Sequence, residues 1–407
     1  MSNQNAHKPG YKHTPLGWIP EEWEVVRVED VAQLNPSRKI LSDEEDVSFL
    51  AMADVSEEGN VINGFVQKYG QVKNGFTYFE NDDILVAKIT PCFENGKGAL
   101  VRNLKNGVGF GSTEFHVIRA GKSVIPDYIF YHTRLYNFRG RGRQNMTGSA
   151  GQQRVPTDFI ETYKFPLPPL PQQRCIAAIL STWDEAITKT RQLITQLQQR
   201  NKGLMQQLLT GRKRLQGFEG EWNEIHLSDA FTERNETGYV NLELLSVGSF
   251  GIYPQSQSEK RDISNADKSK YKRICPGDIG YNTMRMWQGR SALSQLEGIV
   301  SPAYTIVIPK ANQSSLFYSF LFKLPSVVHK FFRNSQGLVE DTLNCKFKDF
   351  ALVKVKVPDY GEQIAIANVL TKANAEVRLY EQKLAVLQQQ KKGLMQKLLT
   401  GEVRVKS

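Results

Sequence analysis

The stretch Lys202-Gly203-Leu204-Met205-Gln206-Gln207-Leu208-Leu209-Thr210-Gly211 decides the fold, because it returns 190 residues later as Lys392-Gly393-Leu394-Met395-Gln396-Lys397-Leu398-Leu399-Thr400-Gly401. At the same offset, Ile176-Ala177 matches Ile366-Ala367 and Leu197-Gln198-Gln199 matches Leu387-Gln388-Gln389. A period of nearly half the chain indicates two copies of one large unit and excludes a short-period solenoid. We therefore expect two similar halves.

Each repeated stretch ends a segment with the pattern of a long helix. The segments 172–209 and 362–399 follow prolines and stop before Gly211 and Gly401, as helices commonly do. At about 1.5 Å per residue each helix is about 57 Å long, which suits a spacer. In the alternative interpretation, each helix only covers its own globular domain.

The apolar residues of both segments step by four and three residues, which predicts a coiled-coil seam. One polar residue interrupts the seam at a matched position in each copy, Asn201 and Lys391, where it costs stability and fixes the alignment. The seam consists of Ile176, Leu180, Trp183, Ile187, Thr190, Ile194, Leu197, Asn201, Leu204 and Leu208 in the first copy and of Ile366, Leu370, Ala373, Val377, Tyr380, Leu384, Leu387, Lys391, Leu394 and Leu398 in the second.

Between the helical segments lie two stretches rich in Gly, Phe, Tyr and short β-like runs, such as Ile84-Leu85-Val86-Ala87. These stretches read as mixed α/β globular domains. We expect a flexible tail at 1–14, a first domain at 15–165, a helical region at 166–215, a second domain at 216–355 and a C-terminal helical region at 356–407.

The net charge of +10 and the pI near 9.2 favour a polyanionic partner, with nucleic acid as the first candidate and a solvated basic surface as the plain alternative. No apolar stretch approaches the eighteen residues of a membrane span. The four cysteines form no Cys-x-x-Cys pair, and residues 1–14 lack the apolar core of a signal peptide, so we expect a cytoplasmic protein.

The motifs of the enzymes that act on DNA are missing. Asn95-Gly96-Lys97-Gly98 lacks the hydroxyl residue and the upstream glycine of a P-loop. Asn35-Pro36-Ser37-Arg38 lacks the second proline and the aromatic residue with which amino-methyltransferases hold a flipped base. The histidines show no metal-ligand spacing, so we expect no catalytic residue and no metal site.

Base recognition needs Arg, Lys, Asn and Gln side chains presented from loops or helix starts, because their donors and acceptors match base edges. Both globular stretches carry such residues among glycines, and this recurrence favours a shared DNA-binding face. The candidates in the first stretch are Lys88, Arg139, Arg141, Arg143, Gln144, Asn145, Gln153 and Arg154; those in the second are Arg285, Gln288, Arg290, Arg333, Asn334, Gln336 and Lys346.

Several motifs accompany the double Lys-Gly-Leu-Met-Gln-x-Leu-Leu-Thr-Gly stretch: Gly17-x-Ile19-Pro20-x-x-Trp23, Leu167-Pro168-Pro169-Leu170-Pro171-Gln172-Gln173, Gly277-Asp278-Ile279 and residues 147–156. With these motifs the chain resembles, over nearly its whole length, the DNA specificity subunit of type I restriction-modification enzymes. One departure is Pro358-Asp359-Tyr360-Gly361-Glu362-Gln363, which replaces the proline-rich lead and predicts a looser start of the second helix.

The resemblance implies an α+β fold with two mixed α/β target-recognition domains, separated by two long antiparallel coiled-coil helices in a pseudo-twofold repeat. It also implies a host-defence subunit without catalysis that reads a bipartite, gapped site in double-stranded DNA. Two methyltransferase subunits and the motor-nuclease subunits would join it. S-adenosylmethionine, ATP and Mg would be bound by these partners and not by this chain, and the gap would follow the helix length. The competing interpretation is a free-standing DNA-binding regulator or decoy, followed by an interaction scaffold.

Overall fold

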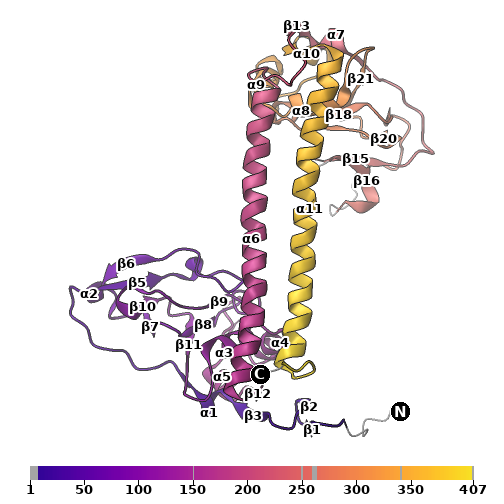
Figure 1. The fold of residues 1–407 in the computed structure, drawn as a ribbon. Coiled ribbons are helices and arrows are strands. Elements are labelled where there is room, and N and C mark those ends of the chain that lie inside the picture. The colour runs from indigo at the N-terminus through magenta and orange to yellow at the C-terminus, as the bar shows by residue number, and fades with distance from the viewer. Residues whose placement is uncertain (1–7, 150, 249–250, 259–263, 340–341, 406–407) are drawn as a thin grey trace. The chain divides into compact units, whose positions relative to one another are not determined.

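The computed structural model describes residues 8–149, 151–248, 251–258, 264–339 and 342–405 (Figure 1). Its chain divides into two compact units: unit 1 comprises Met1–Thr190 and Lys383–Ser407, and unit 2 comprises Arg191–Gln382. Each unit therefore contains one β-rich domain and part of each long helix. The domain boundaries expected after residues 14, 165, 215 and 355 stay predictions.

The β-rich domain of unit 1 is built around two four-stranded sheets. One sheet has the order β6-β5-β10-β7 with β5 and β10 parallel, and the other is antiparallel with the order β4-β11-β8-β9. The strands are β1 (Tyr11–Thr14), β2 (Gly17–Pro20), β3 (Glu24–Arg27), β4 (Ala32–Leu34), β5 (Asp46–Leu50), β6 (Phe65–Lys68), β7 (Thr77–Glu80), β8 (Ile84–Ala87), β9 (Gly98–Leu100), β10 (Val108–Gly111), β11 (Phe115–Ala120) and β12 (Lys164–Leu167). The short helices are α1 (Val28–Val31), α2 (Tyr69–Val72), α3 (Pro126–Thr133), α4 (Tyr136–Gln144) and α5 (Thr157–Glu161).

Unit 2 repeats the antiparallel sheet of unit 1 with the order β14-β21-β18-β19. In both units a strand at the start of the domain pairs with the strand that precedes the following long helix, β3 with β12 and β13 with β22. The strands are β13 (Asn223–His226), β14 (Phe231–Glu233), β15 (Leu245–Gly248), β16 (Gly251–Pro254), β17 (Lys272–Ile274), β18 (Ile279–Asn282), β19 (Ser291–Leu293), β20 (Gly298–Val300), β21 (Tyr304–Pro309) and β22 (Lys354–Val357). The short helices are α7 (Leu227–Ala230), α8 (Ser315–Leu321), α9 (Pro325–Asn334) and α10 (Phe347–Ala351).

The N-terminal tail is shorter than expected. Tyr11–Thr14 forms β1, which pairs with β2 in an antiparallel register that joins Tyr11 to Pro20 and Thr14 to Gly17. The expectation of an unstructured segment up to residue 14 is therefore wrong for 11–14, because backbone pairing with β2 orders this polar stretch. Residues 1–7 lie outside the described residues.

The two long helices confirm the helical prediction. They are α6 (Leu170–Leu208) and α11 (Tyr360–Leu399), within two residues of the predicted segments (magenta and yellow in Figure 1). Gly211 and Gly401 follow them with φ of +68° and +73°, the left-handed conformation that glycine adopts without a steric penalty after a helix.

A buried glutamine ties the start of each long helix to its own domain. In unit 1, Gln173 accepts the backbone N–H of Ile125 at 2.9 Å and donates to the carbonyl of Pro168 at 2.8 Å. In unit 2, Gln363 accepts the N–H of Ser314 at 2.9 Å and donates to the carbonyl of Pro358 at 3.0 Å. Ile125 and Ser314 are the N-caps of α3 and α8, so the same bond joins equivalent elements in both units.

A tryptophan contacts the residue before each glutamine. The indole N–H of Trp23 donates to Gln172 at 2.8 Å, and that of Trp222 donates to Glu362 at 3.2 Å. Glu362 is fully buried and also receives two hydrogen bonds of 2.7 Å from Arg214. The start of α11 is therefore firmly held without the proline-rich lead, and the expectation of a looser start is wrong.

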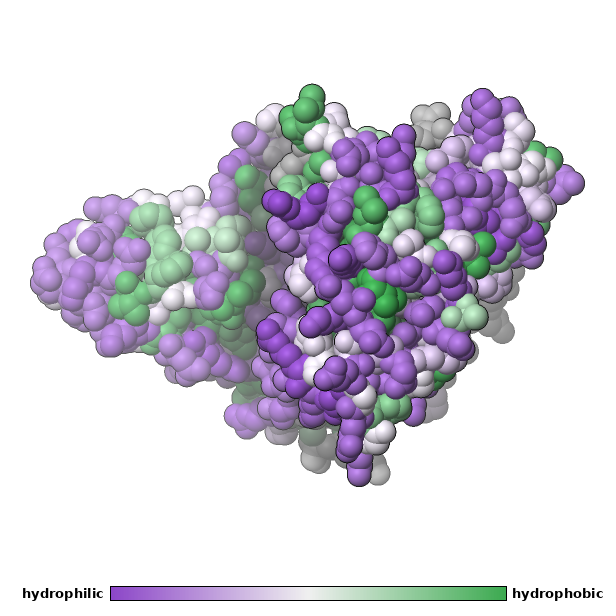
Figure 2. All heavy atoms as spheres, turned by 90° about the horizontal axis from the view of Figure 1, so that it is seen from above, coloured by the Kyte–Doolittle hydropathy of each residue, from purple (hydrophilic) through white to green (hydrophobic). Residues whose placement is uncertain are grey.

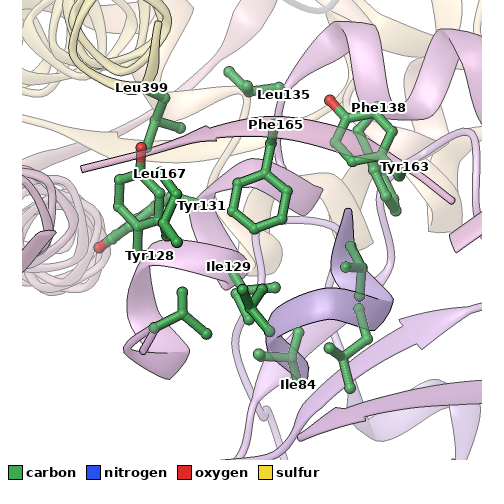
Figure 3. Packing of buried hydrophobic residues seen from close by; sticks show 14 of the residues in the cluster. Ile84, Tyr128, Ile129, Tyr131, Leu135, Phe138, Tyr163, Phe165, Leu167 and Leu399 are labelled. Carbon is green, nitrogen blue, oxygen red and sulfur yellow. The ribbon is translucent and has the colours of Figure 1, made fainter. Parts of the chain in front are cut away.

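The residues at both ends of the predicted seam are apolar and buried in each unit. In unit 1, Ile176 and Leu180 of α6 belong to one core with Leu398 and Leu399 of α11, and Figure 3 shows Leu399 beside the aromatic residues of this core. In unit 2, Leu208 of α6 and the following Leu209 share a core with Ile366 and Leu370 of α11. Residues further along α6 thus meet residues earlier in α11, which makes the pairing antiparallel. The helices also pack onto their globular domains, as the alternative interpretation expected, so both kinds of contact are present.

Hydrophilic residues form most of the face visible in Figure 2, and apolar residues lie between them. Among the helices of the described residues, none has the length and apolar character needed to cross a membrane.

The C-terminal end of α11 should stabilise unit 1. Replacing the buried Leu398 by Ala should lower the free energy of unfolding by about 2–5 kcal/mol, because most of a branched aliphatic side chain is removed from the core and leaves a cavity. Urea denaturation followed by circular dichroism measures this loss. Val386→Ala on the same helix is the control, since Val386 is 51% exposed and its loss should cost less than about 0.5 kcal/mol. Equal losses in the two variants would contradict the packing of Leu398.

A buried histidine should make unit 1 sensitive to acid. Burial lowers the pKa of His132 from 6.5 to about 3, and its ring lies 4.8 Å from the rings of Tyr128 and Phe165. The fold favours the neutral ring, so its contribution to stability is complete above pH 6.5 and declines as the pH falls from 6.5 towards 3.

Phenylalanine, which has an aromatic ring without an ionisable group, supplies the matched variant. His132→Phe should flatten the loss of thermal stability between pH 7 and pH 4.5, measured by calorimetry. His329→Phe changes a histidine with a solvent-accessible ring and serves as the control. An unchanged pH profile in His132→Phe would contradict the assignment.

Candidate nucleic-acid interface

In unit 1, one group of the predicted DNA-contacting residues meets where β8 ends. The carbonyl of Lys88, directly after β8, accepts the N–H of Val155 at 3.0 Å. The carbonyl of Gln153 accepts the N–H of Thr90 at 3.0 Å. Arg154 and Thr147 exchange backbone hydrogen bonds of 3.0 and 2.9 Å. Lys88, Gln153 and Arg154 therefore lie together at the base of a loop that Thr147 and Arg154 close.

The side chains of this group are already engaged within unit 1. Arg154 donates from Nε and Nη2 to Glu114 at 2.9 and 2.8 Å, and from Nη1 to the carbonyl of Gln152 at 3.1 Å. Lys88 donates to the carbonyl of Thr113 at 2.9 Å, and burial lowers its pKa. Contact between Arg154 and a base would therefore require the exchange of existing bonds.

Helix α4 carries the second group of unit 1, and its members differ in exposure. Arg139 is half-buried, and burial lowers its pKa. Arg141 and Asn145 line a cavity of about 460 Å³. Arg143 and Gln144 are exposed. The structure thus turns Arg139 towards the domain and leaves the rest of the group accessible.

Unit 2 contains a loop that matches the one after β8. Gln336 and Asn344 exchange backbone hydrogen bonds of 2.8 Å, as Thr147 and Arg154 do in unit 1. The N–H of Cys345 donates to the carbonyl of Thr283 at 2.8 Å, which corresponds to the bond between Val155 and Lys88. Lys346 follows this loop and lines a cavity of about 570 Å³.

Three further predicted residues of unit 2 gather around the 3₁₀ turn η4 (Met286–Gln288). Arg285 is the N-cap of η4, and the ring of Trp287 lies 6.2 Å from that of Phe332 on α9. The C-terminal turn of α9 carries the exposed Arg333 and the half-buried Asn334. The packing of η4 on α9 therefore brings together residues that are about 50 positions apart in the sequence.

Gln288 and Arg290 line the largest of these cavities, of about 730 Å³, together with residues of β19, α8, α6 and α11. Lys323 and Arg378 also line it, whereas none of the described residues around it is an Asp or a Glu. A concave surface with three cationic side chains and no carboxylate favours an anion such as a phosphate group. We call it the cationic cavity.

Lys323 shows the effect of this charge distribution. Its ammonium group donates to the carbonyl of Gly289 at 2.6 Å and to that of Ser291. Burial and the nearby Arg290 together lower its pKa to about 8. An anion in the cationic cavity would favour the charged ammonium group and raise this pKa.

The corresponding position of unit 1 has a different electrostatic environment. Arg134 stands directly before the N-cap of α4, as Lys323 stands before the N-cap of α9, and it donates to the carbonyl of Gly96. Burial and Arg139 lower its pKa to about 10, but the carboxylates of Asp184, Glu58 and Glu57 oppose this shift.

Sequence reasoning missed Lys323 and Arg378. A closer alignment of the repeats would have found Lys323, because Lys323-Leu324 and Arg134-Leu135 precede matched helices. Arg378 carries no such signal, since Thr188 occupies its place in α6. Among the described residues there is no group of three or more His, Cys, Asp or Glu placed to hold a metal ion.

Comparisons with known proteins agree with this architecture. Residues 20–199 match the sequence model of the family described as the type I restriction modification DNA specificity domain. The chain is 33% identical over 251 residues to the specificity subunit of the type I restriction enzyme EcoAI from Escherichia coli, an alignment that covers 60% of this chain and 42% of that subunit. The chain therefore matches less than half the length of this relative.

Two further similarities extend over nearly the whole chain. The specificity subunit of the enzyme MjaVIII from Methanocaldococcus jannaschii is 24% identical over 96% of this chain and 95% of its own length. A chain from a structure on complex assembly and conformational transition of the type I R-M system superposes with a TM-score of 0.61 at 19% identity, covering 95% of this chain and 99% of that one. With the matched domain and the repeated architecture, the chain is similar to the specificity subunits of type I restriction-modification enzymes.

Proposed function

We propose that this chain is the non-catalytic subunit that recognises a bipartite, gapped site in double-stranded DNA and directs the other subunits of a type I restriction-modification complex. The observation that carries the proposal is the matched loop in the two units, Thr147–Arg154 and Gln336–Asn344, which stands at the same place beside the central strand of each domain. Each unit would read one half of the site.

The two loops share a backbone arrangement but differ in their side chains. Gly148, Ser149 and Gly151 are small and polar, whereas Leu338 and Val339 are 101% and 60% exposed apolar residues. Small residues allow close approach of the backbone, and apolar residues suit contact with a thymine methyl group. This difference supports the reading of two unlike half-sites.

We infer that two methyltransferase subunits and the motor-nuclease subunits are the partners, and that S-adenosylmethionine, ATP and Mg are bound by them. Exposed apolar residues on α11, such as Leu379 at 65% and Val386 at 51%, support a docking role for the long helices. The similarity to type I specificity subunits supports the predicted non-catalytic role of this chain.

Mapping of methylated bases tests this proposal. Cells that express the chain with its cognate methyltransferase should carry one gapped motif, and the chain alone should methylate nothing. Gln153→Ala should relax or weaken one half of the motif, and Gln336→Ala the other half, because each residue lies on the loop of one unit. Gln390→Ala, at an exposed position on α11, should leave the motif unchanged.

The competing function makes a different forecast. A free-standing regulator or decoy would bind its site tightly at physiological salt without a methyltransferase, and no methylated motif would appear. Loss of both half-sites in each of the two loop variants would also contradict the assignment of one half-site to each unit.

The cationic cavity should contribute phosphate contacts that are independent of the DNA sequence. Arg290→Ala/Arg378→Ala in the assembled methyltransferase should weaken DNA binding and reduce the slope of log K against log salt by about 1–2, because up to two phosphate contacts are lost. Fluorescence anisotropy at several salt concentrations measures the slope. Arg273→Ala is the control, since Arg273 is held by Glu236 and Glu297. An unchanged slope in the double variant would exclude a phosphate in the cationic cavity.

A further inference from the structure

The repeat creates an ambiguity in how the long helices pair. The last turns of α6 and α11 carry the same four apolar residues in the same order, Leu204, Met205, Leu208 and Leu209 in α6 and Leu394, Met395, Leu398 and Leu399 in α11. The set from α11 packs into the core of unit 1, and the set from α6 packs into the core of unit 2. Because the two sets are identical, they do not determine which helix end packs into which core.

One polar contact in each unit differs between the two copies. In unit 1, the ammonium group of Lys391 binds the carboxylate of Asp184. In unit 2, the amide of Asn201 donates to the side-chain oxygen of Asn374 at 3.2 Å. We call these contacts crossing 1 (Asp184 and Lys391) and crossing 2 (Asn201 and Asn374).

The two crossings are equivalent under the repeat. An offset of 190 residues takes Asp184 to Asn374 and Asn201 to Lys391. The same two places in the helix pair are therefore filled by an ion pair in unit 1 and by two amides in unit 2. Asn201 is 5% exposed and the side chain of Lys391 is 16% exposed, so this member of each crossing is shielded from water, whereas the side chain of Asp184 is 40% exposed.

We propose that the two crossings make helix pairing selective, so that α6 pairs with α11 of its own chain and not with α6 of a second copy. If two copies exchanged helices, α6 would lie antiparallel to α6 and α11 to α11. Asp184 would then face Asn201 of the second copy, and Lys391 would face Asn374. Each unlike contact leaves a charge without an opposite charge, which is most unfavourable for the shielded ammonium group of Lys391.

The surroundings of crossing 1 strengthen this selection. The hydroxyl of Tyr131 donates to the second oxygen of Asp184 at 2.9 Å, and the ammonium group of Lys391 lies 5.3 Å from the centre of the Tyr131 ring. Phe320 takes the place of Tyr131 in unit 2 and offers an aromatic ring but no hydroxyl. A lysine brought to crossing 2 would therefore lose its carboxylate partner, and the hydroxyl that binds this carboxylate has no counterpart there.

Crossing 2 has its own support for an amide. Arg200 donates from Nε and Nη2 to the side-chain oxygen of Asn201 at 3.2 and 3.0 Å, and its Nη2 also binds Glu376 at 2.7 Å. A lysine at the place of Asn201 would meet a guanidinium group without accepting its hydrogen bonds. The neighbours of both crossings thus agree with the residues that occupy them.

Two double variants with the same residue types test the proposal in the full chain. Asn201→Asp/Asn374→Lys adds an ion pair at crossing 2 and gives α6 two aspartates and α11 two lysines, so that pairing between copies would join like charges. Asn201→Lys/Asn374→Asp adds the reversed ion pair and gives each helix one charge of each sign, so that pairing between copies is fully matched. Both variants keep matched crossings within one chain.

Size-exclusion chromatography with light scattering measures the fraction of dimer after unfolding and refolding at several protein concentrations. We expect Asn201→Lys/Asn374→Asp to form about tenfold more dimer than the wild type, and Asn201→Asp/Asn374→Lys to form no more than the wild type. Equal dimer fractions in the two variants would overturn the proposal.

A third variant covers the case in which a new charge at crossing 2 prevents folding. Asp184→Asn/Lys391→Asn makes both crossings amide pairs and removes the distinction between the helices without adding a charge. It should also raise the dimer fraction about tenfold, with circular dichroism unchanged. A folded variant that refolds to the same monomer fraction as the wild type would refute the role of the crossings.

Discussion

The structure depends on the buried glutamine at the start of each long helix. Gln173 and Gln363 each accept a backbone N–H from the N-cap of a short helix and donate to a proline carbonyl, so one side chain fixes both the direction of the long helix and the position of its domain. An amide in an apolar setting must satisfy its donor and its acceptor, and only one orientation of the helix does so in each unit. The β-rich domains can diverge because this junction stays constant.

The sequence predicted the helices well because the repeat, the seam and the terminal glycines agree with one another. It also identified Asn201 and Lys391 as interruptions of the seam. It did not identify their partners, Asn374 and Asp184, because a seam that repeats in both helices has the same apolar period in several registers. The start of α11 was misjudged for a related reason: Glu362 appeared as one more charged residue, and its burial against Arg214 depends on tertiary packing.

The candidate interface shows where sequence reasoning stops. Sequence reasoning selected residues by type, and in the structure several of these residues lie around two matched loops and the cationic cavity. It could not distinguish Arg143, which is exposed, from Arg139, four residues earlier on the same short helix, which is half-buried. Nor could it find Lys323, because a lysine between two helices is ordinary until its carbonyl partners and the absence of carboxylates among the described lining residues are known. A charged residue therefore indicates a binding role only when the groups around it in the folded protein are known.

The two units differ in how their last helical turns are connected. In unit 2 the residues after α6 run directly on through Arg214 and Trp222 into β13, so the helix end and the domain are one continuous stretch of chain. In unit 1 the residues after α11 reach the domain only through noncovalent contacts, such as that between Arg404 and Glu22. The short segment after α6 gives this helix end a high effective concentration beside the core of unit 2. The end of α11 is separated along the chain from the domain of unit 1 by all of unit 2, so its effective concentration there is lower. Fraying of the helical pair should therefore begin at the end of α11.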